Sequence, residues 1–231
     1  MALVIDAPKI ATVPVDGGGE FPVRRVWCVG RNYSEHAREM GHDPDREEPF
    51  FFIKPSDAIV LDGATIPYPS MTRSVHHEIE LVVAIGKGGS DIDPAKAMEH
   101  VFGYAVGVDL TRRDLQNEAK KQGRPWEMGK AFDNSAMIGT ISPLAKTGPL
   151  DKAAIWIQVN GQDRQRSDVA KLIWSVPEII GHLSRYVELG AGDLIYTGTP
   201  EGVNAVVAGD EMHGHIDGLH DLRIRIAGSS T

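Results

Sequence analysis

The strongest constraint on the fold of this chain is a β-type segment, His77–Ile85, that carries two acidic residues at its start. A strand sends alternate side chains to opposite faces, so Glu78 and Glu80 point one way while Ile79 and Leu81 point the other. Two neighbouring carboxylates on one face of a hydrophobic strand are costly unless a cation or water neutralises them. Two interpretations follow: the glutamates bind a divalent metal through their oxygen atoms, or the strand is half-exposed with a solvated acidic face.

The length and composition are those of an ordinary globular protein. A chain of 231 residues can form one substantial core, or one core with a small appendage. A net charge of −8, with no long basic stretch to offset it, argues against a nucleic-acid partner. The longest apolar runs are far too short to span a bilayer, so no membrane partner is expected either.

Cysteine usage and the first residues favour a cytoplasmic protein. The single cysteine, Cys28, excludes an internal disulfide and suits a reducing compartment. Its neighbours Trp27 and Val29 are apolar, which favours a buried structural thiol over a nucleophile. Residues 1–20 contain neither a basic start nor a sustained apolar core, so no signal peptide is expected.

Shifts in composition divide the chain into three predicted parts. Residues 1–20, which end in the glycine-rich stretch Asp16–Gly19, are expected to form a loosely held N-terminal arm. Residues 21–69 are expected to form a small N-terminal segment with short strands and a helix over 34–40. Residues 70–231 then form the main, β-rich domain.

Local signals place several elements in that domain. Asn160-Gly161 supplies the positive φ angles of a type I′ turn, so a β-hairpin is expected around it. Capping boxes at 111–114 and 175–178 open helices that should end at Gly123 and near Gly190. Strands outnumber helices without a βαβ rhythm, so the predicted fold class is α+β, mainly β, with mixed topology and a few short helices. The other predicted elements are a helix at 94–100, the strand 102–110, the hairpin strands 155–159 and 162–166, and strands at 193–197, 210–216 and 222–226.

Asp109 is a third acidic residue of interest, because it ends the apolar run 104–108. Together with Glu78 and Glu80 it would supply oxygen ligands suited to Mg²⁺ or Mn²⁺, which keep waters for a substrate to displace. Zinc is disfavoured because no cysteine cluster or histidine pair has the usual spacing. The other interpretation of Asp109 is a capping role ahead of the helix that follows Thr111.

His36 and Glu39 are three residues apart in the predicted helix 34–40, so they share a face. A carboxylate beside an imidazole raises its basicity and fixes its tautomer, as a general base for water requires. Such a pair on a short helix is also common as a plain surface pair.

Two further features could serve an anion. Lys130, set among apolar residues and glycine, could neutralise an oxyanion or enolate, although most lysines are simply solvated. The segment Thr197–Gly202 has hydroxyls and backbone N–H groups that suit an anion, or it is an ordinary turn.

These residues belong to a set of motifs spread along the chain: Cys28–Tyr33 with His36 and Glu39, Phe52–Pro55, His77–Glu80, Gly103–Asp109, Lys130, and Tyr196–Pro200. In this order the set resembles the fumarylacetoacetate hydrolase family, over nearly everything from Arg25 to Ile226. Three further stretches are similar to the members that hydrolyse fumarylpyruvate in gentisate breakdown, and to related acylpyruvases: Arg38–Pro44, Thr111–Gln116 and Gly123–Trp126.

The resemblance implies a mixed β-sandwich roll, usually a homodimer, that binds Mg²⁺ or Mn²⁺, with Ca²⁺ as a substitute. By motif position, Glu78, Glu80 and Asp109 become the metal ligands. The other implied roles are a base dyad of His36 and Glu39 on a lid segment, an oxyanion or enolate stabiliser at Lys130, and contacts to substrate oxygens from Arg113, Gln116 and Thr199.

The function that this resemblance implies is metal-dependent cleavage of a C–C bond in a 2,4-dioxo acid, converting 3-fumarylpyruvate and water to fumarate and pyruvate. His36, oriented by Glu39, would take a proton from water so that hydroxide attacks the distal carbonyl. The metal and Lys130 would stabilise the pyruvate enolate that leaves. Arg31 and Arg113 are candidates to bind the distal carboxylate of the substrate.

Other functions use the same ligand set. They are a general acylpyruvase, an oxaloacetate decarboxylase that needs no attacking water, a dioxo-acid isomerase, and a catalytically silent acid-binding module. The last is disfavoured because the acid, base and metal positions are all intact.

Overall fold

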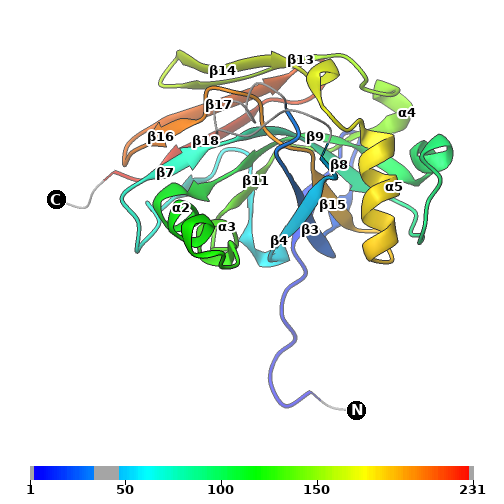
Figure 1. The fold of residues 1–231 in the computed structure, drawn as a ribbon, viewed down its shortest axis with the longest axis horizontal. Helices are drawn as coiled ribbons and strands as arrows, with labels where there is room; N and C mark the ends of the chain where they lie inside the picture. Colours follow the sequence, from blue (N-terminus) through cyan, green and yellow to red (C-terminus); the bar gives the residue numbers. More distant parts are fainter. Residues whose placement is uncertain (1–2, 34–46, 229–231) are drawn as a thin grey trace.

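The computed structural model describes residues 3–33 and 47–228. Eight strands form its larger sheet: β3 (Arg25–Gly30), β4 (Phe50–Lys54), β5 (Ile59–Leu61), β8 (Ile79–Ile85), β9 (Val101–Asp109), β11 (Ala136–Ile138), β12 (Ser142–Pro143) and β15 (Asp193–Tyr196). Seven of them follow the order β4–β3–β15–β8–β9–β11–β5, and β12 pairs with β9 (Figure 1). β3 runs parallel to β15, so strands from near the two ends of the chain are neighbours in this sheet.

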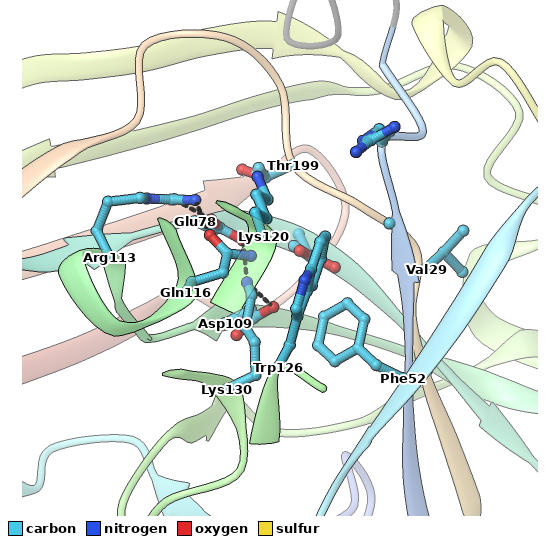
Figure 2. A pocket seen from close by; sticks show the side chains of 13 residues that line it. Val29, Phe52, Glu78, Asp109, Arg113, Gln116, Lys120, Trp126, Lys130 and Thr199 are labelled. Carbon is cyan, nitrogen blue, oxygen red and sulfur yellow. Dashed lines mark hydrogen bonds and ion pairs between the residues drawn. The ribbon is translucent and has the colours of Figure 1, made fainter. Parts of the chain in front are cut away.

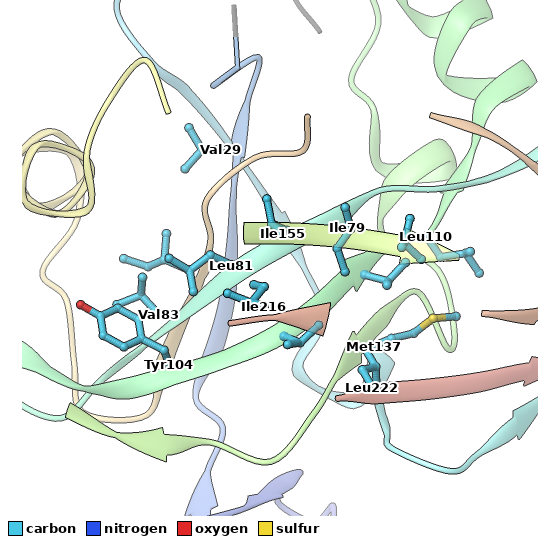
Figure 3. Packing of buried hydrophobic residues seen from close by; sticks show 14 of the residues in the cluster. Val29, Ile79, Leu81, Val83, Tyr104, Leu110, Met137, Ile155, Ile216 and Leu222 are labelled. Atoms are coloured by element: carbon cyan, nitrogen blue, oxygen red, sulfur yellow. The ribbon is translucent and has the colours of Figure 1, made fainter. Parts of the chain in front are cut away.

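A second, five-stranded sheet packs on one face of the larger sheet. It consists of β6 (Thr65–Ile66), β13 (Ala154–Val159), β14 (Gln162–Asp168), β17 (Glu211–Ile216) and β18 (Leu222–Ile226), in the order β14–β13–β17–β18–β6. Ile79 and Leu81 of β8 lie in one core cluster with Ile155 of β13 and Ile216 of β17 (Figure 3). Removing these apolar side chains from water is the main force that holds the two sheets together.

The other face of β8 is also buried. Val82 and Ala84 belong to a second apolar cluster that includes Cys28 of β3 and Tyr196 of β15. Burial raises the pKa of the Cys28 thiol well above its ordinary value, which confirms the expected structural thiol. Because both faces of β8 are covered, any charged group on this strand is remote from bulk water.

The N-terminal residues differ from the expected loose arm. Residues 3–10 extend away from the body without regular structure (Figure 1). β1 (Thr12–Pro14), however, pairs antiparallel with β2 (Glu20–Pro22). Val13 is fully buried and Phe21 nearly so, both in the second cluster, and this burial fixes the chain from residue 11 onward. The segment 21–69 likewise contributes β3 and β4 to the larger sheet.

Short helices lie around the sheets. They are the α-helices α2 (Arg113–Gln122), α3 (Glu127–Lys130), α4 (Leu144–Thr147) and α5 (Val176–Tyr186), with the 3₁₀ helices η1 (Ser56–Ala58), η2 (Pro94–His100) and η3 (Val169–Lys171). β10 (Thr111–Arg112), β7 (Val75–His77) and β16 (Asn204–Val206) form a small sheet, and β10 leads directly into α2. The fold is therefore mainly β with few helices, as predicted. Within the described ranges, no helix is long and apolar enough to cross a bilayer.

Several local predictions are confirmed. β13 and β14 form the predicted hairpin, with positive φ at Asn160 and Gly161 (50° and 73°). The capping box between Ser175 and Glu178 opens α5. That helix ends at Tyr186, before the expected Gly190, because Val187 turns the chain extended and Leu189 then bridges to Gly89.

The helix after Thr111 begins without the predicted capping box. α2 starts at Arg113 with no side-chain cap, and it ends as expected at Gly123, whose φ is 62°. The Asp114 carboxylate instead accepts hydrogen bonds from the Thr72 hydroxyl (2.5 Å) and the Arg73 N–H (3.0 Å). The predicted helix over 34–40 lies outside the described residues.

Candidate active site

The register of β8 and β9 brings three carboxylates together. Ile79 is opposite Val108, so Glu78 lies opposite Asp109, whose N–H donates to the Glu78 carbonyl (2.9 Å). Glu80 lies on the same face, and one oxygen from each of the three side chains falls within 4.8 Å of the others. The exposed fractions of Glu78, Glu80 and Asp109 are 5%, 2% and 1%. The interpretation of a half-exposed strand with a solvated acidic face is therefore wrong.

Three cationic side chains contact this cluster: Lys130, Arg113 and Lys54. The Lys130 ammonium donates to Glu78 Oε2 (2.7 Å), Asp109 Oδ2 (2.6 Å) and the Thr111 hydroxyl (2.7 Å). Arg113, at the start of α2, pairs with Glu78 from the other side (Figure 2). Burial alone would lower the pKa of Lys130, but Asp109 and Glu78 raise it, so the ammonium stays protonated at neutral pH. Lys130 is thus a buried cation, and the interpretation as an ordinary solvated lysine is wrong.

The structure also decides the local role of Asp109. Its carboxylate contacts Lys130 and, through Oδ1, the ammonium of Lys54 (2.8 Å). The Asp109 carboxylate does not cap α2, because that helix begins after Arg112 with no side-chain cap. The Thr111 hydroxyl donates to the Asp109 backbone carbonyl (3.3 Å). The capping interpretation of Asp109 is wrong.

Lys54 is buried beside the carboxylate cluster, which the sequence did not predict. It is fully buried at the end of β4, and its ammonium donates to the backbone carbonyls of Leu110 (3.1 Å) and Lys130. These contacts hold the chain on both sides of the cluster. The available signal was a single charge at the end of the aromatic run Phe50–Phe52.

Glu80 has a different environment from the other two carboxylates. The Gly198 N–H, next to the end of β15, donates to Glu80 Oε2 (2.7 Å). Burial, with the neighbouring charges of Asp109 and Glu78, raises the pKa of Glu80 well above its ordinary value. The turn that was expected to suit an anion therefore directs its N–H group at a carboxylate of the protein itself.

The residues predicted to contact substrate line the pocket above this cluster. Gln116 accepts a hydrogen bond from Arg113 Nη1 (2.6 Å), and the Thr199 hydroxyl accepts one from Gln165 Nε2 (2.8 Å). Gln165 also accepts a bond from the Ile79 N–H (3.1 Å), which ties the Thr199 turn to β8. The lining residues are Val29, Gly30, Arg31, Phe52, Glu78, Glu80, Asp109, Arg113, Gln116, Lys120, Trp126, Lys130 and Thr199.

Lys120 and Trp126 are pocket residues that the sequence reasoning did not single out. The Lys120 ammonium lies 4.9 Å from the centroid of the Trp126 ring. Residues three and seven positions apart share one face of a helix, and Gln116 and Lys120 stand at these distances from Arg113. This spacing was the signal that could have found Lys120.

The cluster fits a divalent metal. Three buried carboxylates within reach of one another are hard oxygen donors of the kind that Mg²⁺, Mn²⁺ and Ca²⁺ take. The raised pKa of Glu80 indicates that this carboxylate has too little positive charge around it, and a bound cation would supply that charge. The predicted base dyad, His36 and Glu39, lies outside the described residues.

Comparisons with known proteins identify the family of this chain. The family model described as fumarylacetoacetate (FAA) hydrolase, C-terminal, matches residues 25–227. A fumarylpyruvate hydrolase of Ralstonia sp. is 46% identical over 81% of this chain and 98% of its own length. A mitochondrial oxaloacetate tautomerase of Rattus norvegicus is 40% identical over 89% of this chain and 96% of its own.

A solved structure is similar over nearly the whole chain. The crystal structure of fumarylpyruvate hydrolase from Pseudomonas aeruginosa, in complex with Mn²⁺ and pyruvate, is 55% identical in sequence, with a TM-score of 0.95. The match covers 99% of this chain and 100% of that one. With the family model spanning both sheets and every described site residue, the chain belongs to the fumarylacetoacetate hydrolase family.

Proposed function

We propose that this protein is a divalent-metal-dependent hydrolase that cleaves the C–C bond of an acylpyruvate, with 3-fumarylpyruvate converted to fumarate and pyruvate. The observation that supports this most is the buried cluster of Glu78, Glu80 and Asp109 with Lys130 hydrogen-bonded inside it. The similar Pseudomonas aeruginosa enzyme was crystallised with Mn²⁺ and pyruvate, which supports the same metal and product class here.

Each described side chain receives a role in this proposal. Glu78, Glu80 and Asp109 would hold Mg²⁺ or Mn²⁺, and a bound ion would act as a Lewis acid on the substrate's carboxylate and 2-oxo oxygens. Arg113, Gln116 and Thr199 would orient substrate oxygens at the wall of the pocket. Lys130 would neutralise the enolate oxygen of pyruvate as the C–C bond breaks, because its ammonium is already fixed beside the carboxylates.

The proton transfers are assigned to the dyad that the sequence motifs indicate. His36, oriented by Glu39, would accept a proton from water as the hydroxide adds to the distal carbonyl. The enolate then takes up a proton to give pyruvate, and the acyl group leaves as fumarate. The proposal includes a homodimeric, cytoplasmic enzyme of gentisate-type aromatic degradation.

A second candidate function is oxaloacetate decarboxylation or tautomerisation. The 40% identity to a mitochondrial oxaloacetate tautomerase supports it, since both reactions pass through the enol or enolate of a 2-oxo acid. Neither reaction needs an attacking water. A His36→Ala variant would therefore lose hydrolysis while keeping substantial decarboxylation.

The experiment is pyruvate release from fumarylpyruvate and acetylpyruvate, with oxaloacetate assayed in parallel. We expect turnover of the acylpyruvates with Mg²⁺ or Mn²⁺ and none in excess chelator. Undiminished hydrolysis in excess chelator would overturn the metal-dependent mechanism. Turnover of oxaloacetate alone would favour the second candidate.

A further inference from the structure

We propose that Lys120 is the specificity-determining residue that binds the distal carboxylate of a dicarboxylic acylpyruvate. This inference rests on the proposed function and names the substrate class of the same pocket. It assigns to Lys120 the second cationic contact for which Arg31 and Arg113 were the candidates from sequence.

The position of Lys120 on α2 separates it from the carboxylate cluster. Arg113, Gln116 and Lys120 face the same pocket, and Arg113 contacts Glu78. Seven residues of α-helix advance about 10 Å, so Lys120 is attached roughly that far along the helix from Arg113. A substrate held by its 2-oxo acid end at the cluster would present its other end toward this part of the pocket.

Two of the other cations lining the pocket already have carboxylate partners, and Arg31, at the pocket wall, lies over the Phe50 ring (5.5 Å). Lys130 binds Glu78 and Asp109, and Arg113 binds Glu78. Lys120, in contrast, makes no salt bridge among the described residues, and Glu78, the carboxylate whose charge acts on it, is already paired with Lys130 and Arg113. Its ammonium group is therefore available to an anion that enters the pocket.

The surroundings of Lys120 favour such an anion. Its side chain is half-buried, with the ammonium against the Trp126 ring. Burial, together with the positive charges of Arg113 and Arg31, lowers the pKa of Lys120 to about 8. A substrate carboxylate beside Lys120 would offset the cost of burying its ammonium and the repulsion from the two arginines. A neutral acyl group would not.

Three variants separate this role from others. Lys120→Gln removes the charge but keeps a polar side chain, and Lys120→Arg keeps the charge. Lys121→Gln removes the same charge from the next, exposed residue of α2 and serves as the matched control. All are assayed as the Mn²⁺-loaded protein on fumarylpyruvate and on acetylpyruvate, which has the same 2,4-dioxo acid but no distal carboxylate.

We expect Lys120→Gln to lower the ratio of kcat/KM for fumarylpyruvate over acetylpyruvate by about 10- to 100-fold, mainly through KM. Lys120→Arg should restore most of this ratio, and Lys121→Gln should leave it within about twofold of wild type. Equal losses on both substrates would overturn the proposal, because they would indicate a structural role beside Trp126. An unchanged ratio would overturn it too.

Failure of the proposed function gives a different result. If the wild-type protein cleaves neither acylpyruvate, both compounds are titrated calorimetrically into the Mn²⁺-loaded wild type and Lys120→Gln. A loss of affinity confined to fumarylpyruvate would then uphold the role of Lys120 without hydrolysis. Equal affinities in the two proteins would reject it.

Discussion

The ammonium nitrogen of Lys130 lies 2.6 Å from Asp109 Oδ2, with both side chains shielded from solvent. The same ammonium contacts Glu78, so one cation joins the carboxylate at the end of β9 to that of the residue just before β8. Removing one partner of a buried ion pair leaves an uncompensated charge, which costs about 3–5 kcal/mol. This relationship makes Lys130 important for stability as well as for the proposed chemistry.

Lys130→Met should lower hydrolysis of fumarylpyruvate by about 100-fold or more, because the developing enolate then loses the ammonium that supplements the bound metal. Its melting temperature without metal should fall, and added Mn²⁺ should restore more of it than in wild type, since the metal replaces the lost charge. Thermal melts with and without Mn²⁺ measure this effect. A variant with wild-type activity would contradict the role of Lys130.

Lys54→Met should destabilise the protein by about 3–5 kcal/mol, because Asp109 loses a buried ion pair and two carbonyls lose a donor. Urea unfolding measures the change. Lys152→Met, which changes an exposed lysine, is the control and should stay within about 0.5 kcal/mol. A loss below about 1 kcal/mol for Lys54→Met would show that its contacts add little to stability.

Gly198 has two requirements that a side chain would violate. Its φ is 103°, and an added Cβ would lie 2.7 Å from the Asn32 Cβ. Gly198→Ala should therefore cost more than Gly209→Ala, since Gly209 also has a positive φ (93°) but open space around it. We expect about 1 kcal/mol for Gly209→Ala and about 3 kcal/mol or more for Gly198→Ala in urea unfolding.

Gly198→Ala should also reduce the affinity for Mn²⁺, because displacing this turn moves the N–H that holds Glu80. Gly209→Ala should bind Mn²⁺ as wild type does. Equal unfolding free energies for the two variants would mean that the Asn32 contact relaxes without cost.

His215 makes the stability depend on pH. Burial alone would lower its pKa, but hydrogen bonds to Asp221 (2.6 Å) and Asp217 (3.1 Å) raise it above the ordinary 6.5. The protonated imidazole of His215 is therefore stabilised more in the folded than in the unfolded protein. Its contribution to stability is complete below about pH 6.5 and is lost as the pH rises through the folded-state pKa. His215→Gln should thus cost up to about 1 kcal/mol at pH 6, and less at pH 9.

Urea unfolding of wild type and His215→Gln at the two pH values measures this difference. His100→Gln is the control, because the His100 imidazole is hydrogen-bonded to the Lys87 carbonyl (2.9 Å) and not to a carboxylate. A loss for His215→Gln that is the same at both pH values would contradict the ion-pair explanation.

The sequence predicted those features whose signals are local. The alternation around Glu78 and Glu80, the Asn160-Gly161 turn and the capping box at Ser175 each depend on neighbouring residues, and the structure confirms the elements they predict. The grouping of Glu78 with Asp109 is not local. It depends on the register of β8 against β9, which residue patterns alone left open. The family resemblance grouped the three carboxylates only as expected metal ligands.

Three features could not be predicted because tertiary contacts decide them. Lys54 looks like a strand-end lysine, and only the packing of β4 beside β3 buries it. Thr111 has the sequence of a helix cap, but the Lys130 ammonium engages its hydroxyl. Val13 lies just ahead of the glycine-rich stretch Asp16–Gly19, yet it packs in the second apolar cluster.

The most direct test of the account is Mn²⁺ binding by wild type and Glu80→Gln, measured by titration calorimetry in the absence of substrate. Glu99→Gln, an exposed carboxylate, removes the same charge as a control. We expect one tight site per chain in wild type and Glu99→Gln, and a loss of roughly 100-fold or more in Glu80→Gln. Equal Mn²⁺ affinity in Glu80→Gln and wild type would contradict the claim that this carboxylate cluster is the metal site.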